Sequence, residues 1–246
     1  MRTLVVLPTY NEISNIDPMI RALRATVPDA HILVVDDASP DGTAARADLL
    51  AAELGRVEIL RRPSKSGLGG AYRAGFAWGL ARGFDHFVEI DCDFSHDPAT
   101  LPTLLAAAQG VDVVIGSRYV VGGSIPQWSW RRRLLSRGGN VYASTVLGLR
   151  VADATSGYRV YAARGLAAMD YDSVRADGYG FQIEMTYRAR RAGLVIAEVP
   201  ISFTDRTRGE SKMSGAIVVE ALLLVTGWAL ARPWRSVLRC IDHERY

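Results

Sequence analysis

Four acidic side chains, each following a short apolar segment, are the residues best placed to do chemistry in this 246-residue chain. Asp36 and Asp37 end one such segment, and Asp91 and Asp93 end another. An Asp-x-Asp pair can place two hard oxygen ligands on one side of Mg²⁺ or Mn²⁺, an ion that keeps several waters and bridges to substrate phosphates. A single acid of this kind would more simply face water or cap a helix. Two such clusters together predict a divalent-cation site that receives a phosphate-bearing substrate.

Basic side chains gather in two short segments of the second half of the chain. They are Arg118, Arg131, Arg132, Arg133 and Arg137 in the first segment, and Arg206, Arg208 and Lys212 in the second. Arginine offers phosphate a two-pronged set of donors, and lysine supplies a point charge. The formal net charge is only +3, whereas a nucleic-acid-binding protein would show a broader basic face or a recognised module. This set of cations fits phosphate groups better than nucleic acid, and we expect no nucleic-acid partner. Because neighbouring residues of a helix diverge, Arg131, Arg132 and Arg133 cannot all face one ligand, and those that do not are expected to face anionic lipid headgroups or water.

The elements that must position these side chains are short apolar runs alternating with segments of helical periodicity. This alternation predicts βαβ units and a parallel sheet whose strands are buried on both faces. The expected strands are 2–7, 31–35, 57–60, 86–90 and 111–115. The first expected helix buries Ile13, Ile16, Met19, Ile20 and Leu23. Ligands of such sheets bind beyond the carboxyl ends of the strands, which is where the acidic clusters and Arg118 fall.

A glycine-rich segment, Ser66-Gly67-Leu68-Gly69-Gly70, opens the helix expected over 67–81. It falls short of the dinucleotide-binding Gly-x-Gly-x-x-Gly pattern, because Tyr72 stands in the place of the third glycine, and the chain has no Walker A loop. The glycines suit either close packing of the helix on the sheet or a ligand contact, and the sequence leaves both open.

An almost wholly apolar run covers residues 214–231 and includes Glu220. At 18 residues it is at the short limit for a membrane span, so we expect it to pack on protein or lie in the bilayer interface, with an oligomer contact as the alternative. Trp128 and Trp130 suit either a membrane interface or the core.

The composition is that of an ordinary globular protein, with 49% hydrophobic and 22% charged residues. The length predicts one large domain or two small ones. Two cysteines, Cys92 and Cys240, are too few for a disulfide framework and indicate a reducing compartment. The apolar N-terminal run ends at Pro8 and is expected to be a buried strand rather than a signal sequence.

Several segments resemble a known family. Pro8-Thr9-Tyr10-Asn11-Glu12, the segment 35–42 and Asp91-Cys92-Asp93 resemble glycosyltransferase family 2. Four later segments resemble the dolichyl-phosphate (polyprenol-phosphate) mannose synthases of that family: Gly116-Ser117-Arg118-Tyr119, the arginine-rich 130–137, Thr155-Ser156-Gly157-Tyr158-Arg159, and the spacing of Arg206, Gly209, Ser211 and Lys212. The resemblance spans about residues 3–213. It implies an α/β GT-A (Rossmann-like) fold, with a mostly parallel sheet flanked by helices and a C-terminal apolar or amphipathic helix.

The resemblance also implies an activity, namely inverting transfer of mannose from GDP-mannose to a polyprenyl phosphate. It places the nucleotide sugar at Pro8, Tyr10, Glu12, Val35, Asp37, Asp91 and Cys92, and Mg²⁺ or Mn²⁺ at Asp91 and Asp93. Four residues match phosphate-binding positions of the family: Arg118, Arg132, Arg206 and Lys212. The expected catalytic residues are Asp93, Arg118, Arg206 and Lys212. Cys92 is expected to act through its backbone position. Family members often have Gln where this chain has Ser95, so an additional metal contact there is not expected.

These expectations describe a catalytic domain over 1–212 and an apolar helix with a basic tail over 213–246. The protein would lie peripherally on the cytoplasmic face of the cell membrane, with homo-oligomer formation left open. The nearest alternative is a family 2 transferase that makes polyprenyl-phosphate glucose from UDP-glucose. A non-catalytic membrane-docking module and a nicotinamide-dependent oxidoreductase are the alternatives from other classes.

Overall fold

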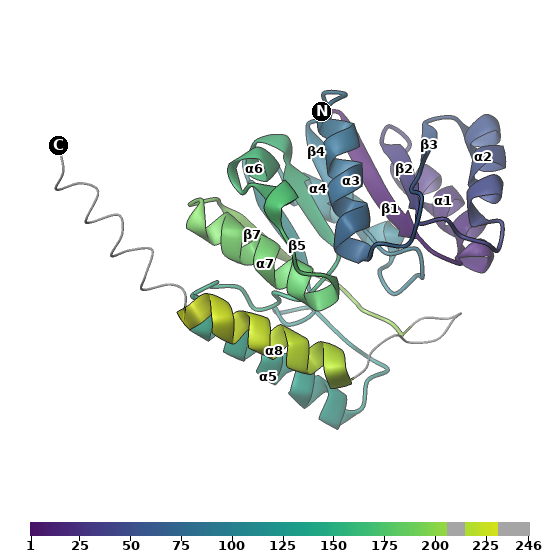
Figure 1. Cartoon of the computed structure of the whole chain (residues 1–246). Helices are drawn as coiled ribbons and strands as arrows, with labels where there is room; N and C mark the ends of the chain where they lie inside the picture. The colour runs from purple at the N-terminus through teal and green to yellow at the C-terminus, as the bar shows by residue number, and fades with distance from the viewer. Residues whose placement is uncertain (206–214, 231–246) are drawn as a thin grey trace, which may run out of the picture.

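The computed structural model describes residues 1–205 and 215–230, which form a seven-stranded sheet between two layers of helices (Figure 1). The strand order is β3-β2-β1-β4-β6-β5-β7. The strands are β1 (Thr3–Thr9), β2 (His31–Asp36), β3 (Val57–Arg61), β4 (His86–Glu89), β5 (Val113–Ser117), β6 (Arg159–Ala162) and β7 (Ile196–Pro200). The five strands expected from the sequence are confirmed, and β6 and β7 are additional.

The sheet is mostly parallel, as expected, but it is not uniform. β6 runs antiparallel to both of its neighbours, with Val88 of β4 and Val114 of β5 each opposite Val160. β6 therefore lies between β4 and β5, whereas a simple βαβ series would place β5 next to β4. This one reversed strand brings the loop before Arg159 to the same edge as the ends of β4 and β5.

Helices cover both faces of the sheet (Figure 1). They are α1 (Ile13–Thr26), α2 (Thr43–Leu54), α3 (Leu68–Leu80), α4 (Leu101–Ala107), α5 (Trp130–Leu147), α6 (Ala163–Ala168), α7 (Gly178–Arg191) and α8 (Gly215–Leu230), with short 3₁₀ turns at Pro98–Thr100 and Tyr171–Ser173. Alternate residues of β1 pack into the two hydrophobic cores on opposite faces of the sheet. Leu4 and Val6 pack with the α3 and α7 side chains, whereas Val5 and Leu7 pack with those of α1, α2 and α4.

The α1 helix buries four of the five residues expected on its inner face. Ile16, Met19, Ile20 and Leu23 are fully buried. Ile13 is 42% exposed, because it is the first residue of the helix and precedes the turn that reaches the core. That part of the expectation is wrong.

The glycines of α3 allow this helix to lie directly on the sheet. A Cβ atom at Gly75 would come 2.4 Å from a methyl carbon of Val6, and one at Gly79 would come 2.5 Å from Leu4 and Phe87. Close packing therefore accounts for the glycine-rich composition of the helix body. Gly67 and Leu68, at its start, are the part of the segment that reaches a cleft.

Replacing Gly75 by Ala is expected to lower the free energy of unfolding by about 1–3 kcal/mol, because the added methyl group overpacks a core that has no room for it. Urea denaturation measures the change. Gly138→Ala is the matched control, since this glycine lies in α5 with nothing within 4 Å of its Cβ position. The control should gain up to about 1 kcal/mol from helix propensity. Equal effects at both positions would contradict the packing account.

Helices α5 and α8 lie side by side at one end of the molecule, and α8 also contacts α7 (Figure 1). Val225 of α8 is buried in the core, the Tyr142 and Thr226 hydroxyls are 2.8 Å apart, and Trp228 stacks on Tyr187. The α8 helix thus packs on protein, as one expectation for this segment had it. None of the described helices has the length and apolarity needed to cross a bilayer.

Candidate active site

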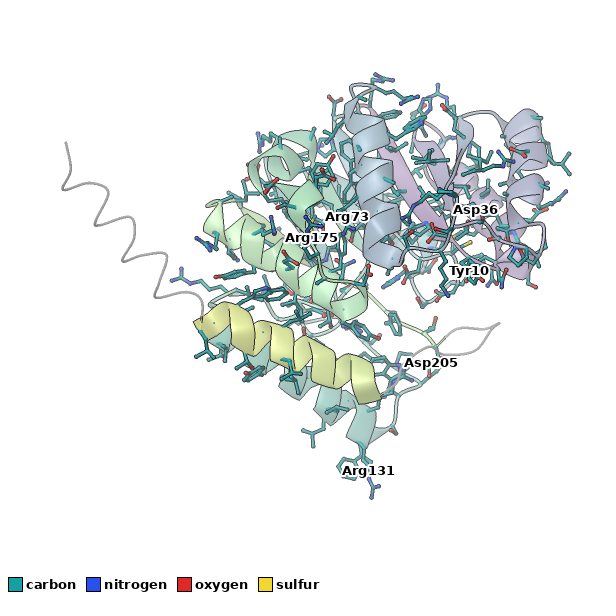
Figure 2. All side chains as sticks on the ribbon, viewed as in Figure 1. Tyr10, Asp36, Arg73, Arg131, Arg175 and Asp205 are labelled. Atoms are coloured by element: carbon teal, nitrogen blue, oxygen red, sulfur yellow. The ribbon has the colours of Figure 1, made fainter. Side chains whose placement is uncertain are left out.

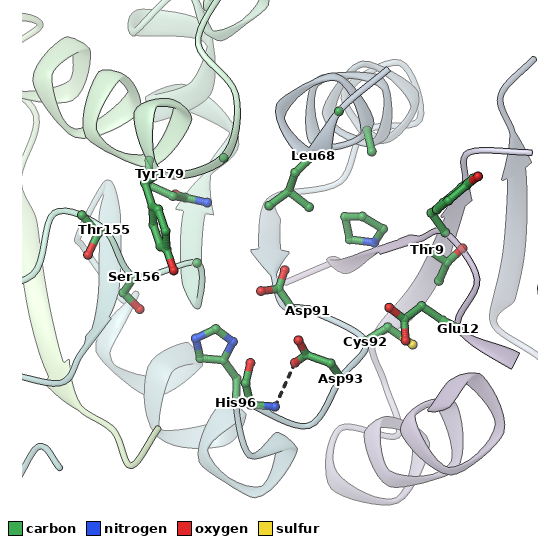
Figure 3. A pocket seen from close by; sticks show the side chains of 18 of the residues that line it. Thr9, Glu12, Leu68, Asp91, Cys92, Asp93, His96, Thr155, Ser156 and Tyr179 are labelled. Carbon is green, nitrogen blue, oxygen red and sulfur yellow. Dashed lines mark hydrogen bonds between the residues drawn. The ribbon is translucent and has the colours of Figure 1, made fainter. Parts of the chain in front are cut away.

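A cleft of about 510 Å³ opens at the carboxyl ends of β1, β4 and β5, where the sequence placed the site. Figure 3 shows Asp91 and Asp93 directed into it from the sheet side, with Tyr179 and Ser156 on the facing wall. Its described lining includes most of the expected residues, namely Pro8, Tyr10, Glu12, Asp37, Asp91, Cys92, Asp93, Arg118 and Arg132. Lys65, which follows the third strand and was expected at this edge of the sheet, also lines it. Residues that no motif had assigned to it include His96, Tyr179, Gln182 and Asp205.

The Asp-x-Asp pair is held by its own loop and by α3. The Ser95 backbone N–H donates to Asp93 Oδ1 at 2.9 Å, so Ser95 supports the acid through its main chain. The Tyr72 hydroxyl donates to Asp91 Oδ1 at 3.3 Å. Burial and the charge of Asp91 raise the pKa of the Tyr72 phenol well above its usual value, so this group remains a donor.

Two carboxylates on one wall of a cleft fit a divalent ion that takes its remaining ligands from water and substrate phosphates. No group of three or more potential metal-binding side chains occurs among residues 1–205 and 215–230. Cys92, between the two acids, is 3% exposed, and burial raises the pKa of its thiol well above the usual value. The thiol is thus an unsuitable ligand, as expected.

One end of the cleft carries the residues expected to hold a nucleotide. Lys65 lies over the Tyr10 ring, with Nζ 4.2 Å from the ring centroid. Asp37 accepts hydrogen bonds from Arg62 Nη1 at 2.7 Å and from the Ser66 backbone at 3.1 Å. Arg62 thus fixes the loop that carries Lys65, a role that no sequence motif had indicated.

Val35 and Asp36, at the end of β2, do not line the cleft. Asp36 is buried and accepts hydrogen bonds from Thr9 and Ser39, so it fixes the turn after β2 (Figure 2). Val35 is fully buried against α3, near Gly75. Any nucleotide contact at Val35 would have to come from its main chain.

Arg118 is a buried member of the cleft wall, and its charge is offset by Asp153. The Arg118 side chain donates to Asp153 through Nε and Nη2, both at 2.7 Å, and Nη2 also donates to Thr155 at 2.7 Å. Burial acts to lower the pKa of Arg118, but Asp153 raises it above its usual value overall. Burial likewise acts to raise the pKa of Asp153, but Arg118 holds it below its usual value. No sequence motif had indicated Asp153, a lone acid two residues before Thr155.

Arg132 is also paired with a carboxylate, that of Asp205. Its Nη1 lies 2.9 Å from Asp205 Oδ1, and its guanidinium carbon lies 3.9 Å from the Trp128 ring centroid. Trp128 is 5% exposed and donates through Nε1 to Asp205 at 2.9 Å, so it is buried against residues of the cleft wall rather than exposed to a membrane interface. Trp130 is 69% exposed. Arg131 projects from the start of α5, away from the sheet (Figure 2).

The described lining of the cleft carries more acidic than basic groups. The acids are Glu12, Asp37, Asp91, Asp93 and Asp205, and the bases are Lys65, Arg118 and Arg132. His96 adds no charge near neutral pH, because burial lowers its pKa to about 4. Behind the cleft, burial raises the pKa of Glu89 to about 8, and Gln182 donates to it at 2.9 Å. Arg206 and Lys212, also expected here, lie outside the described residues.

An apolar groove of about 90 Å³ adjoins the cleft, between α5, α7 and α8. Four residues line both spaces, namely Arg118, Arg132, Thr155 and Tyr179. The rest of the groove is lined mainly by Leu135, Gly139, Ala143, Ile183, Leu222 and Val225. The arrangement can therefore place a charged headgroup in the cleft and an apolar tail in the groove.

Comparisons with known proteins place the chain among glycosyl transferases. Residues 4–168 match the model of the family described as Glycosyl transferase family 2. The chain is 52% identical over 237 residues to an undecaprenyl-phosphate mannosyltransferase of Micrococcus luteus, covering 96% of this chain and 98% of that protein. It is 49% identical over 231 residues to a polyprenol monophosphomannose synthase of Mycolicibacterium smegmatis, covering 93% of this chain and 87% of that protein.

Solved structures share the fold at lower identity. A mannosyl-3-phosphoglycerate synthase from Rubrobacter xylanophilus has a TM-score of 0.62 at 21% identity, covering 97% of this chain and 75% of that one. A mannosyltransferase from Pyrobaculum calidifontis in complex with GDP-Man and Mn²⁺ has a TM-score of 0.58 at 16% identity, covering 98% of this chain and 79% of that one. The sheet, the cleft at its edge and these matches together mean that the chain belongs to glycosyl transferase family 2 and has a GT-A-like fold.

Proposed function

We propose that the protein transfers mannose, with inversion, from GDP-mannose to a polyprenyl phosphate, with Mg²⁺ or Mn²⁺ bound at Asp91 and Asp93. The observation that carries the proposal is the polar cleft joined to an apolar groove across Arg118 and Arg132. A lipid phosphate needs both spaces, whereas a sugar or peptide acceptor needs only the first. The names of the two relatives of about 50% identity support the same activity and acceptor class.

The acceptor itself removes the need for a catalytic base in this proposal. A phosphate monoester has a second pKa near 6, so it arrives with a charged oxygen ready to attack. That oxygen forms a bond to the anomeric carbon of mannose as the bond from this carbon to the diphosphate breaks, and GDP leaves with the electron pair. No proton has to move, so a dedicated general base of the kind used with hydroxyl acceptors is unnecessary.

The electrostatic problem is the approach of two anions. Two unit charges of the same sign repel by about 4 kcal/mol at 4 Å and an effective dielectric constant near 20. Because Asp153 and Asp205 offset Arg118 and Arg132, these arginines supply directed donors more than net charge. A bound divalent cation would supply the missing positive charge and stabilise the departing diphosphate. In this proposal Arg206 and Lys212 add the remaining cationic groups.

A radiochemical assay tests the proposal. Purified protein receives labelled GDP-mannose or labelled UDP-glucose together with polyprenyl phosphate, with and without EDTA. We expect organic-extractable label from GDP-mannose, its loss with EDTA, and its recovery when Mn²⁺ is added in excess. Label from UDP-glucose alone would overturn the assignment of mannose, and undiminished transfer in EDTA would overturn the metal requirement.

We further propose that the protein acts from the cytoplasmic membrane surface, with α5 and α8 at the lipid. Trp130, Leu134 and Val141 recur on one side of α5 and are each more than half exposed. Leu223 and Leu230 of α8 are also mostly exposed. Arginines beside this apolar face, including Arg131, suit anionic headgroups.

Replacing Leu134 by Glu is expected to weaken binding to anionic phospholipid vesicles at least about tenfold, because burying a leucine side chain contributes about 1.5–3 kcal/mol. Co-sedimentation with vesicles measures the change. Leu49→Glu is the matched control, since Leu49 lies on α2 and is 62% exposed, against 66% for Leu134. Equal binding by both variants would contradict the proposed surface.

A further inference from the structure

Tyr72 is the residue of the glycine-rich helix that the proposed reaction leaves without a role. It stands where a dinucleotide-binding loop would have its third glycine, and it is fully buried beneath the cleft. Its hydroxyl does not end in apolar surroundings but reaches Asp91 Oδ1 at 3.3 Å. A buried hydroxyl keeps its place only where a partner compensates for the loss of water, and here that partner is one of the two acids expected to bind the metal.

Two aromatic rings hold the Tyr72 ring and so fix the orientation of its hydroxyl group. It stacks on Phe181 of α7, with centroids 6.0 Å apart and planes 12° from parallel, and on Phe76 of its own helix at 6.1 Å. A Cβ atom at Gly69 would come 2.8 Å from Phe181, so glycine there lets α7 approach α3 closely enough for this stack. The packing of two helices thus sets the position of one oxygen atom.

The hydrogen bond distinguishes the two oxygens of Asp91. Oδ1 accepts from the phenol, whereas Oδ2 lies toward Gly157, 3.8 Å from the position of an ideal Cβ on that residue. Gly157 lines the cleft. The carboxylate is therefore held with Oδ2 on the cleft side, the side from which a cation and a diphosphate would approach.

We propose that Tyr72 is a positioning residue that fixes the Asp91 carboxylate for divalent-cation binding. The inference rests on the metal site of the proposed function and extends it to a residue that touches neither substrate nor metal. Partners of this kind orient metal ligands, and their loss typically lowers metal affinity or activity by about 10–100-fold. Here the partner comes from a different element of the fold than either acid, since Tyr72 lies on α3 and the acids follow β4.

The test is Tyr72→Phe, which removes the hydroxyl and leaves both ring stacks in place. MnCl₂ is titrated into the full-length protein in the presence of GDP and, separately, of UDP, and free Mn²⁺ is followed by its EPR signal. We expect about 10–100-fold weaker Mn²⁺ binding by the variant. In transfer assays, the Mn²⁺ concentration for half-maximal rate should rise similarly, while saturating Mn²⁺ restores kcat and leaves KM for the nucleotide sugar unchanged.

Tyr158→Phe is the matched control. Tyr158 is also a fully buried tyrosine, and its hydroxyl donates to the Asp97 backbone carbonyl at the same distance of 3.3 Å. Its removal should leave Mn²⁺ affinity unchanged. Circular dichroism and thermal melting of both variants show that any difference in Mn²⁺ binding arises in a folded protein.

The outcomes separate this inference from the proposed function. A Tyr72→Phe protein that binds Mn²⁺ as the wild type does overturns the inference alone, as does an activity loss that saturating Mn²⁺ does not restore. Transfer from UDP-glucose in place of GDP-mannose would overturn the proposed donor, while weakened Mn²⁺ binding by the variant would still support the role of Tyr72. A wild-type protein that binds no Mn²⁺ with either nucleotide overturns both.

Discussion

Asp93→Asn is expected to lower kcat for sugar transfer by about a thousandfold or more. The change removes one of the two carboxylates of the proposed metal site, and a cation bound there would contribute several kcal/mol of transition-state stabilisation, of which each 1.36 kcal/mol is a factor of ten. The side-chain amide can still accept the Ser95 backbone N–H through Oδ1, so the loop should keep its shape. Steady-state assays at saturating donor, acceptor and Mn²⁺ measure the loss.

Asp97→Asn, four residues further along, is the matched control. Asp97 Oδ1 accepts the Ala99 backbone N–H at 2.9 Å, the same distance and the same two-residue spacing as the bond from Ser95 to Asp93. Asp97 is exposed and does not line the cleft. The control should therefore retain wild-type kcat. A comparable loss in both variants would mean that the Asp93 effect is one of loop structure and not of metal binding.

Asp153→Asn is expected to lower the free energy of unfolding by about 3–5 kcal/mol, because it leaves the Arg118 guanidinium buried without its counter-charge. Transfer should also be lost, since Arg118 would no longer be held against the cleft. Urea denaturation and acceptor-dependent kinetics measure the two effects separately.

The double variant Arg118→Met, Asp153→Asn separates structure from catalysis. Removing both charges should recover much of the stability, because replacing a buried ion pair costs far less than breaking it. Activity should not return, because the proposed donor to the acceptor phosphate is gone. Asp112→Asn is the control for an ion pair of similar geometry, since its partner Arg164 is 66% exposed and such a pair contributes about 1 kcal/mol or less. Recovery of both stability and activity would contradict the role of Arg118.

The first half of the fold could be predicted because its signals are local. Each of the first five strands is a short apolar run, and each lies close to its expected position. β6 was missed because it has only four residues and begins with Arg159, so its apolar run is too short to stand out. Arg159 is fully buried because it donates to the carbonyl oxygens of Ala154, Ser156 and Gln182. Ala154 and Ser156 are close to Arg159 in the sequence, but Gln182 and the Thr186 hydroxyl, which accepts at 2.9 Å, come from α7, 23 and 27 residues away. A short window of the sequence therefore contains only part of the reason for burial.

The site likewise has parts that the sequence could predict and parts that depend on the folded structure. Residue types and spacing were enough to predict the cleft position of Asp37, Asp91, Asp93 and Arg118. They could not distinguish Asp36 from Asp37, because neighbouring residues at a strand end face opposite ways and only the surroundings decide which one meets the ligand. The groups that set the charge of the arginines, Asp153 and Asp205, are 35 and 73 residues from their partners. Such pairings exist only after folding.

The small volume of the groove between α5, α7 and α8 sets what the protein can recognise in a lipid. A space of about 90 Å³ accommodates only the first few carbons next to the headgroup. The remainder of a long prenyl chain would stay in the bilayer and contribute nothing to selection. Acceptors that differ in the number of isoprene units, or in saturation far from the headgroup, should therefore be used with similar efficiency once they are equally dispersed. The groove that the described residues form therefore does not measure the length of the lipid acceptor.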